Sequence, residues 1–251
     1  SEFARVLASN PLPLPKAMAL DALTIYQEKG LADVDALLKL AEKHPDAEAP
    51  IRTFVRGLRV HQLVSGHEGL ARLLNARLQG TSDSIAPLAA MSSAEWISVA
   101  EEASANPGQA LRMLAQVEKQ HPLTALKAKL DSGNFKFPDV SNKDLSVLLK
   151  DQSESVDALL RGSKSAKDAA AKEASAAHKK LRDVGRFVRT GVNRETAGHL
   201  MSKGVATPAV AIRHGRDSIR KMVRGIHGQE AASGLVDGFF DAVEPALAGA
   251  N

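Results

Sequence analysis

Apolar residues recur every three to four positions along most of the chain, which is the period of an amphipathic helix. The stripe is clear at Val34, Leu37 and Leu38, and it returns at Leu111 and Leu114. Proline, glycine and serine-containing turns separate one stripe from the next. The pattern therefore predicts many short helices joined by tight turns.

Several of the predicted helices carry start signals. In the segment Met91–Trp96, either Ser92 or Ser93 can cap a helix, with Glu95 placed to complete a capping box. Asn106-Pro107 marks a second start, because proline is well tolerated in the first turn of a helix. These signals predict that one helix starts near Ser92 and the next near Asn106.

The composition favours helices over strands. Aromatic residues make up only 4% of the 251 residues, far fewer than sandwiches and barrels use to pack their sheets. Alanine, leucine and long charged residues dominate, and these lose little side-chain freedom in a helix. We expect an all-α fold: an irregular bundle or solenoid-like array of short helices. We also expect one longer helix around 164–190, where the chain is rich in alanine and lysine and has no proline.

The best candidate for a domain break is Asp131–Ser141, which contains Ser-Gly-Asn and Pro138. This break predicts an N-terminal helical subdomain at 4–131 and a basic C-terminal subdomain at 142–251. The first three residues, Ser-Glu-Phe, look like a cloning remnant and are left out of the fold prediction. No apolar run approaches the roughly 20 residues needed to cross a bilayer, so we expect no transmembrane segment.

Four residues on the apolar stripes are the clearest candidates for the core. They are Trp96, Leu111, Leu114 and Leu200. Trp96 is the only tryptophan in the chain, and a large ring within an apolar stripe is most simply a packing anchor.

Charge is distributed unevenly along the chain. Residues 161–224 contain 16 Lys and Arg against five Asp and Glu, a local excess of +11 in a chain whose net charge is +4. The candidate face for an anionic partner consists of Arg182, Arg186, Arg189, Arg213, Arg216, Arg220, Lys221 and Arg224. Such a face is either solvated, or meets an acidic protein neighbour, or binds nucleic acid or lipid.

Sequence-specific nucleic-acid recognition is disfavoured by the residues around this face. Asp217-Ser218-Ile219 offers little at the start of a recognition helix, and only Phe187 lies nearby as a stacking platform. Nonspecific contact with phosphates stays open as an alternative, since it needs only clustered positive charge.

Catalytic signatures are missing from the sequence. There is no cysteine, and the eight histidines have no metal-binding spacing such as H-E-x-x-H. Neither a G-x-S-x-G elbow nor a phosphate-binding glycine loop occurs. We therefore expect no enzymatic activity, no catalytic residues, no metal site and no cofactor.

A family resemblance adds to this picture. The segment Met91–Leu130 contains a tryptophan-bearing helix, an Asn-Pro helix start and a helix that ends in Glu118-Lys119-Gln120-His121-Pro122. In this order of features it resembles the A component of bacterial Tc insecticidal toxin complexes. Leu123 stands where that family has threonine, with Thr124 one place later.

The resemblance continues downstream and covers roughly residues 55–225. There a basic-hydrophobic helix is followed by Leu200-Met201, Gly204 and Val210-Ala211, which is similar to a recurring unit of the family. It implies a helical shell segment of a large pore-forming translocator that assembles as a pentamer, with other protein segments or subunits as partners. A secreted or cell-surface location follows from the resemblance, and a cytoplasmic one without it.

Three functions are compatible with the sequence. The first is a non-enzymatic structural and interaction module of the Tc toxin type. The second is a basic helical protein that binds nucleic acid nonspecifically through residues 161–224. The third is a secreted helical effector.

Overall fold

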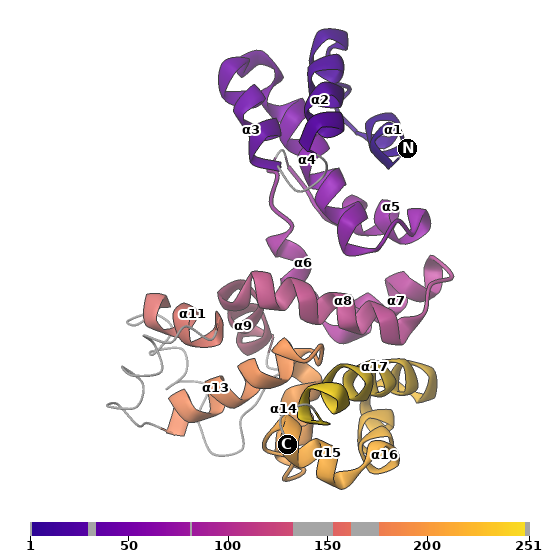
Figure 1. Ribbon diagram of the computed structural model, residues 1–251, viewed down its shortest axis with the longest axis vertical. Coiled ribbons are helices and arrows are strands. Elements are labelled where there is room, and N and C mark those ends of the chain that lie inside the picture. Colours follow the sequence, from indigo (N-terminus) through magenta and orange to yellow (C-terminus); the bar gives the residue numbers. More distant parts are fainter. Residues whose placement is uncertain (1, 30–33, 81, 133–152, 162–175, 249–251) are drawn as a thin grey trace. The chain divides into compact units, whose positions relative to one another are not determined.

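The computed structural model describes residues 2–29, 34–80, 82–132, 153–161 and 176–248. Every regular element within these ranges is a helix, and none is a strand (Figure 1). The predicted all-α fold class is confirmed. The chain divides into two compact units, Ser1–Leu88 and Ala89–Asn251, which are called unit 1 and unit 2 below.

Unit 1 is organised around one long helix. Its elements are α1 (Glu2–Ser9), α2 (Lys16–Lys29), α3 (Val34–Lys43), the short 3-10 helix η2 (Pro45–Ala47), α4 (Glu48–Leu63) and α5 (Glu68–Arg77). Helix α4 packs against α1, α3 and α5. Phe54 on α4 meets Phe3 on α1 edge to face, with ring centroids 5.1 Å apart. Burial of such apolar side chains gives unit 1 a hydrophobic core of its own. Leaving the first three residues out of the fold prediction was therefore wrong, since Phe3 is 2% exposed and belongs to this core. The short α6 (Ala86–Ala90) follows at its end.

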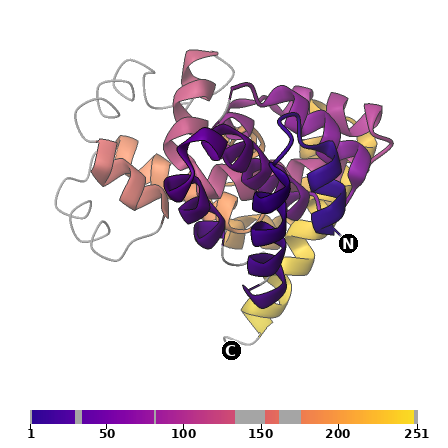
Figure 2. The same cartoon turned by 90° about the horizontal axis from the view of Figure 1, so that it is seen from above.

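Unit 2 contains the remaining helices: α7 (Ser93–Glu102), α8 (Pro107–Gln120), α9 (Pro122–Asp131), α11 (Ser153–Arg161), α13 (Ala176–Arg189), α14 (Arg194–Ser202), α15 (Pro208–His214), α16 (Arg216–His227) and α17 (Gln229–Ala248). Helix α8 is central and packs against α7, α9, α13 and α17. Helix α11 lies beside α13 in Figure 1 and again in Figure 2.

The division into units falls well before the predicted break at Asp131–Ser141, most of which lies outside the described residues. Leu111 and Leu126, which precede that segment, belong to the same hydrophobic cluster as Leu181, Phe187 and Phe239, which follow it. Helices α8 and α9 therefore form one core with the C-terminal helices, and the predicted subdomains 4–131 and 142–251 do not correspond to the two units. Turn-forming residues mark an interruption of helix and carry no information about which helices pack together.

The predicted helix starts are confirmed in detail. Ser92 is the N-cap of α7, accepting from the backbone N–H of Glu95, while the Glu95 carboxylate accepts from the backbone of Ser92. Asn106 caps α8 with Pro107 in the first turn. These caps satisfy backbone donors that the first helical turn leaves free.

The expected long helix at 164–190 is described only in its second half. Helix α13 runs from Ala176 to Arg189 without interruption at Gly185, and residues 164–175 lie outside the described part of the chain. The longest described helix is α17, which has 20 residues and packs against α8 and α16.

All four predicted core residues are buried in unit 2. Trp96, Leu111 and Leu114 have no exposed surface, and Leu200 is 2% exposed. The prediction of these positions is accurate because each lies on the apolar stripe of its helix.

Helices α8 and α17 approach each other at glycines. A Cβ added at Gly108 would lie 2.6 Å from the Cα of Gly234, which is backbone and cannot rotate away. We expect Gly108→Ala to lower the free energy of unfolding by about 2 kcal/mol, since overpacking outweighs the better helix propensity of alanine. Gly225→Ala is the matched control, because nothing lies within 4 Å of its added Cβ; it should stabilise by up to about 1 kcal/mol. Urea denaturation of both variants tests this, and equal effects would contradict the close crossing.

Candidate functional site

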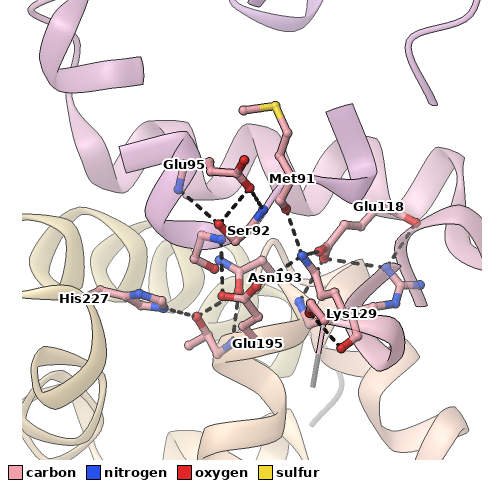
Figure 3. A network of polar contacts seen from close by, with 12 residues as sticks. Met91, Ser92, Glu95, Glu118, Lys129, Asn193, Glu195 and His227 are labelled. Atoms are coloured by element: carbon pink, nitrogen blue, oxygen red, sulfur yellow. Dashed lines mark hydrogen bonds and ion pairs between the residues drawn. The ribbon is translucent and has the colours of Figure 1, made fainter. Parts of the chain in front are cut away.

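Unit 2 contains a cluster of charged side chains inside the protein, called the buried charge network below. It consists of Glu118, Lys129, Arg194 and Glu195. Figure 3 shows Glu118, Lys129 and Glu195 converging from three helices. Helix α8 provides Glu118, α9 provides Lys129, and the first turn of α14 provides Arg194 and Glu195.

Glu118 occupies the centre of this network with no exposed surface. Its Oε1 lies 3.1 Å from Nζ of Lys129. Its Oε2 accepts a hydrogen bond of 2.8 Å from the backbone N–H of Arg194 and lies 3.6 Å from the Arg194 guanidinium. The same guanidinium donates to the main-chain carbonyl of Glu118. One carboxylate thus connects three segments of the chain.

Lys129 is 1% exposed and has a partner in several directions. Besides Glu118, its ammonium lies 3.4 Å from Oε1 of Glu195 and donates to the main-chain carbonyl of Met91 at 3.0 Å. These are the partners that a desolvated ammonium requires. Lys129 therefore connects α9 to the start of α7 and to α14.

Glu195 extends the network to the N-terminus of α7. Its Oε2 accepts from the backbone N–H of Ser93, the first residue of that helix, at 3.2 Å. A carboxylate here complements the partial positive charge of the helix terminus. Unlike Glu118 and Lys129, the Glu195 side chain is partly accessible, with 16% of its surface exposed.

A neutral polar chain continues from the network to helix α16. Asn193 caps α14 by accepting from the backbone N–H and the hydroxyl of Thr196. The Thr196 oxygen also lies 2.7 Å from Nε2 of His227. Because the hydroxyl proton is directed to Asn193, we assign the proton of His227 to Nε2, which donates to Thr196. Figure 3 shows this line from His227 to Asn193.

Burial lowers the pKa of His227 to about 4, with His199 adding to the shift and the Glu195 carboxylate opposing it. The unfolded chain binds this proton near pH 6.5, so it holds more protons than the folded protein between pH 6.5 and 4. Stability should therefore fall by about 2 kcal/mol as the pH drops from 7 to 5. His227→Gln, which keeps a side-chain N–H donor, should remove most of this dependence in urea titrations at the two pH values. An unchanged pH slope in that variant would exclude His227 as its source.

The buried charge network was not predicted from the sequence, although a signal for part of it exists. Glu118 lies seven residues after Leu111 and four after Leu114, on the same apolar stripe of α8. Lys129 likewise follows Ala125 at helical spacing on the buried face of α9. A single charge of opposite sign on each of two consecutive apolar stripes indicates a buried ion pair. No such signal precedes Arg194 and Glu195, which follow a loop.

Three of the eight residues of the predicted anionic-partner face are paired with acids of unit 2. Arg216 pairs with Asp241 at 3.0 Å and Glu244 at 3.1 Å, and Arg220 pairs with Asp237 at 2.7 Å. These three acids lie on α17, which contains every Asp and Glu that follows position 224. The basic stripe of α16 thus meets an acidic stripe of the same chain.

The other residues of that face differ in their surroundings. Arg186 pairs with Asp183 one turn earlier, and Arg189 donates to the main-chain carbonyl of Leu160. Arg182 is half-buried on the same helix. The exposed members on α15 and α16 are Arg213, Lys221 and Arg224. The structure therefore separates the predicted face into three arginines that are paired with acids and a group of exposed cations, to which Arg189 also belongs.

Among the described residues, no three His, Asp or Glu side chains gather as metal ligands. One histidine has a clear structural role, since His67 caps α5 by accepting from the backbone N–H of Leu70. None of the described helices is long and apolar enough to cross a membrane.

Comparison of the chain with protein-family models, with curated proteins and with solved structures finds no match. Function is therefore argued from the residues and contacts described above.

Proposed function

We propose that the chain is a non-enzymatic helical scaffold that contacts other proteins through its surface. The observation that supports this proposal most strongly is the buried charge network. Its two carboxylates and two cations are balanced and paired with one another inside unit 2. Carboxylate, ammonium and guanidinium groups often act as acids, bases or anion ligands, but here they form ion pairs that hold helices together. This is expected of a protein whose function depends on a fixed shape.

The resemblance to the A component of Tc toxins supplies a setting for such a scaffold. The segment that carries the resemblance, Met91–Leu130, is the α7–α9 region, and it contributes Glu118 and Lys129 to the network. In this proposal the chain is a helical shell segment of a large assembly, and its partners are other segments or subunits.

The exposed cations favour a protein partner over nucleic acid. Arg216 and Arg220 are paired with acids of α17, and Arg186 is paired with Asp183. The exposed members of the predicted face that have no acidic partner in the described part of the chain are Arg189, Arg213, Lys221 and Arg224. Four cations are few for phosphate-driven binding, since affinity from counterion release grows with the number of phosphates contacted. An acidic protein surface is a better match for a small group of this kind.

A titration against duplex DNA separates this proposal from its rival. We expect no measurable binding at about 50 mM salt, where phosphate-driven affinity is strong. Fluorescence anisotropy of a labelled duplex over a salt series provides the measurement. The contrary result is binding that weakens steadily with salt and is lost in the triple variant Arg213→Gln, Lys221→Gln, Arg224→Gln. The double variant Lys16→Gln, Lys39→Gln in unit 1 is the control for a general loss of positive charge.

A further inference from the structure

Unit 1 contains a cavity of about 730 Å³ between α1, α4 and α5. Pockets that hold small organic molecules have volumes of roughly 300 to 1,000 Å³. The cavity is therefore much larger than a single ion requires. Its charged and polar lining includes Arg5, Arg56, Arg72, His61, Glu68 and Asn75.

The lining carries a net positive charge. One arginine comes from each of the three helices: Arg5 from α1, Arg56 from α4 and Arg72 from α5. Glu68 is the only acid among the described residues of the lining, and it pairs with Arg5 at 2.9 Å. Both members of that pair are more than 60% exposed, so the bridge is weak and Arg5 can turn to another anion. Three arginines and one glutamate give a formal charge of +2.

Arg56 lies deep in this lining, with 3% of its surface exposed. It donates to Oδ1 of Asn75 at 3.2 Å and to three main-chain carbonyls, those of Gly80 at 2.9 Å, Ser82 at 3.4 Å and Gln79 at 3.5 Å. None of the ion pairs among the described residues includes it, and burial lowers the pKa of its guanidinium. A buried guanidinium that has neutral partners alone lacks the compensation that a carboxylate or phosphate provides.

His61 is a second, independent sign of an unfilled polar site. Its residue is 8% exposed, its ring lines the cavity, and its Nδ1 is buried without a hydrogen-bond partner. A buried polar atom with no hydrogen-bond partner costs free energy. A ligand can recover this free energy by bonding to the atom, or by making the ring turn so that the atom finds a partner. His61 lies five residues after Arg56 on α4.

We propose that this cavity binds a small organic phosphate monoester. Such a group carries a charge near −2 at neutral pH, which matches the +2 of the lining, and its oxygens fit the planar donors of arginine. The remaining volume accommodates an organic body. The walls that would contact this body are apolar or small: Ala8, Pro11, Ala71, Ala76 and Leu78. This binding site is separate from the scaffold function, which rests on contacts of unit 2.

Isothermal titration with four probes tests the proposal: phenyl phosphate, inorganic phosphate, benzoate and phenol. We expect saturable binding of phenyl phosphate, weaker binding of inorganic phosphate and benzoate, and none of phenol. Equal affinity for benzoate and phenyl phosphate would overturn the assignment to phosphate esters. The absence of saturable binding by phenyl phosphate would overturn the site itself.

Substitutions of two arginines on helix α5 provide a matched pair of variants for the titration with phenyl phosphate. Arg72→Gln removes an exposed cation of the lining and should weaken phenyl phosphate binding by about tenfold, as for loss of one charge-assisted hydrogen bond. Arg77→Gln removes an exposed cation of α5 outside the lining and should leave the affinity unchanged. Neither position is buried, so both variants should fold. An equal effect of the two substitutions would assign the binding to general surface charge and contradict the proposal.

Discussion

Replacing Glu118 by glutamine should lower the free energy of unfolding by about 3 to 5 kcal/mol. The substitution keeps the shape of the side chain but removes the charge that faces both Lys129 and Arg194. Lys129 then retains Glu195 alone as an ionic partner, and Arg194 retains none of those described. Breaking a buried pair from one side is costly because the remaining charge stays desolvated. Urea denaturation followed by Trp96 fluorescence measures the loss.

An exposed ion pair of unit 2 provides the control for this experiment. Asp157 pairs with Arg161 one turn later on α11, and the Arg161 side chain is 49% exposed. Asp157→Asn should therefore change stability by less than about 1 kcal/mol. The double variant Glu118→Gln, Lys129→Met should be less destabilised than the sum of its single variants, because the two share one interaction. Strict additivity would show that the two groups do not interact.

Replacing Trp96 by alanine should also cost about 3 to 5 kcal/mol. The indole is fully buried, and its removal leaves a cavity in a core that can collapse only in part. Circular dichroism in a urea series measures the loss, because the variant has no tryptophan for fluorescence.

Ser98→Ala on the same helix is the matched control for Trp96→Ala. Ser98 is exposed on α7, so its replacement should leave stability within about 0.5 kcal/mol of the wild type. A loss below about 1 kcal/mol for Trp96→Ala would contradict the close packing around the indole.

The sequence predicts local structure well because local structure depends on neighbouring residues. The capping box at Ser92 and Glu95 and the Asn106-Pro107 start lie within a few residues of the helices they begin. The burial of Trp96 and Leu111 follows from the 3.6-residue period of one helix. The division into units depends instead on which distant helices pack together. Leu111 and Phe239 share one core although a candidate break lies between them, and no local signal encodes that contact.

The candidate sites show the same distinction. The basic stripe of α16 is visible in the sequence, but its neutralisation requires Arg216 and Arg220 to meet Asp237 on α17, which is a tertiary contact. The buried charge network joins residues as far apart as Ser93 and Glu195. Charge on an apolar stripe predicts burial of Glu118 and Lys129, whereas their partners are specified only by the packing of α14 against the start of α7.

The central claim is that the chain is a scaffold within a larger assembly. Mass photometry of the protein in its natural context tests this claim most directly, because it measures the mass of the assembly that contains the chain. The scaffold proposal predicts a stable complex of several subunits, with five copies if the resemblance to Tc toxin A components reflects kinship. A single copy that stays unassociated at all accessible concentrations, and that turns over a substrate or retains bound nucleic acid, would contradict it.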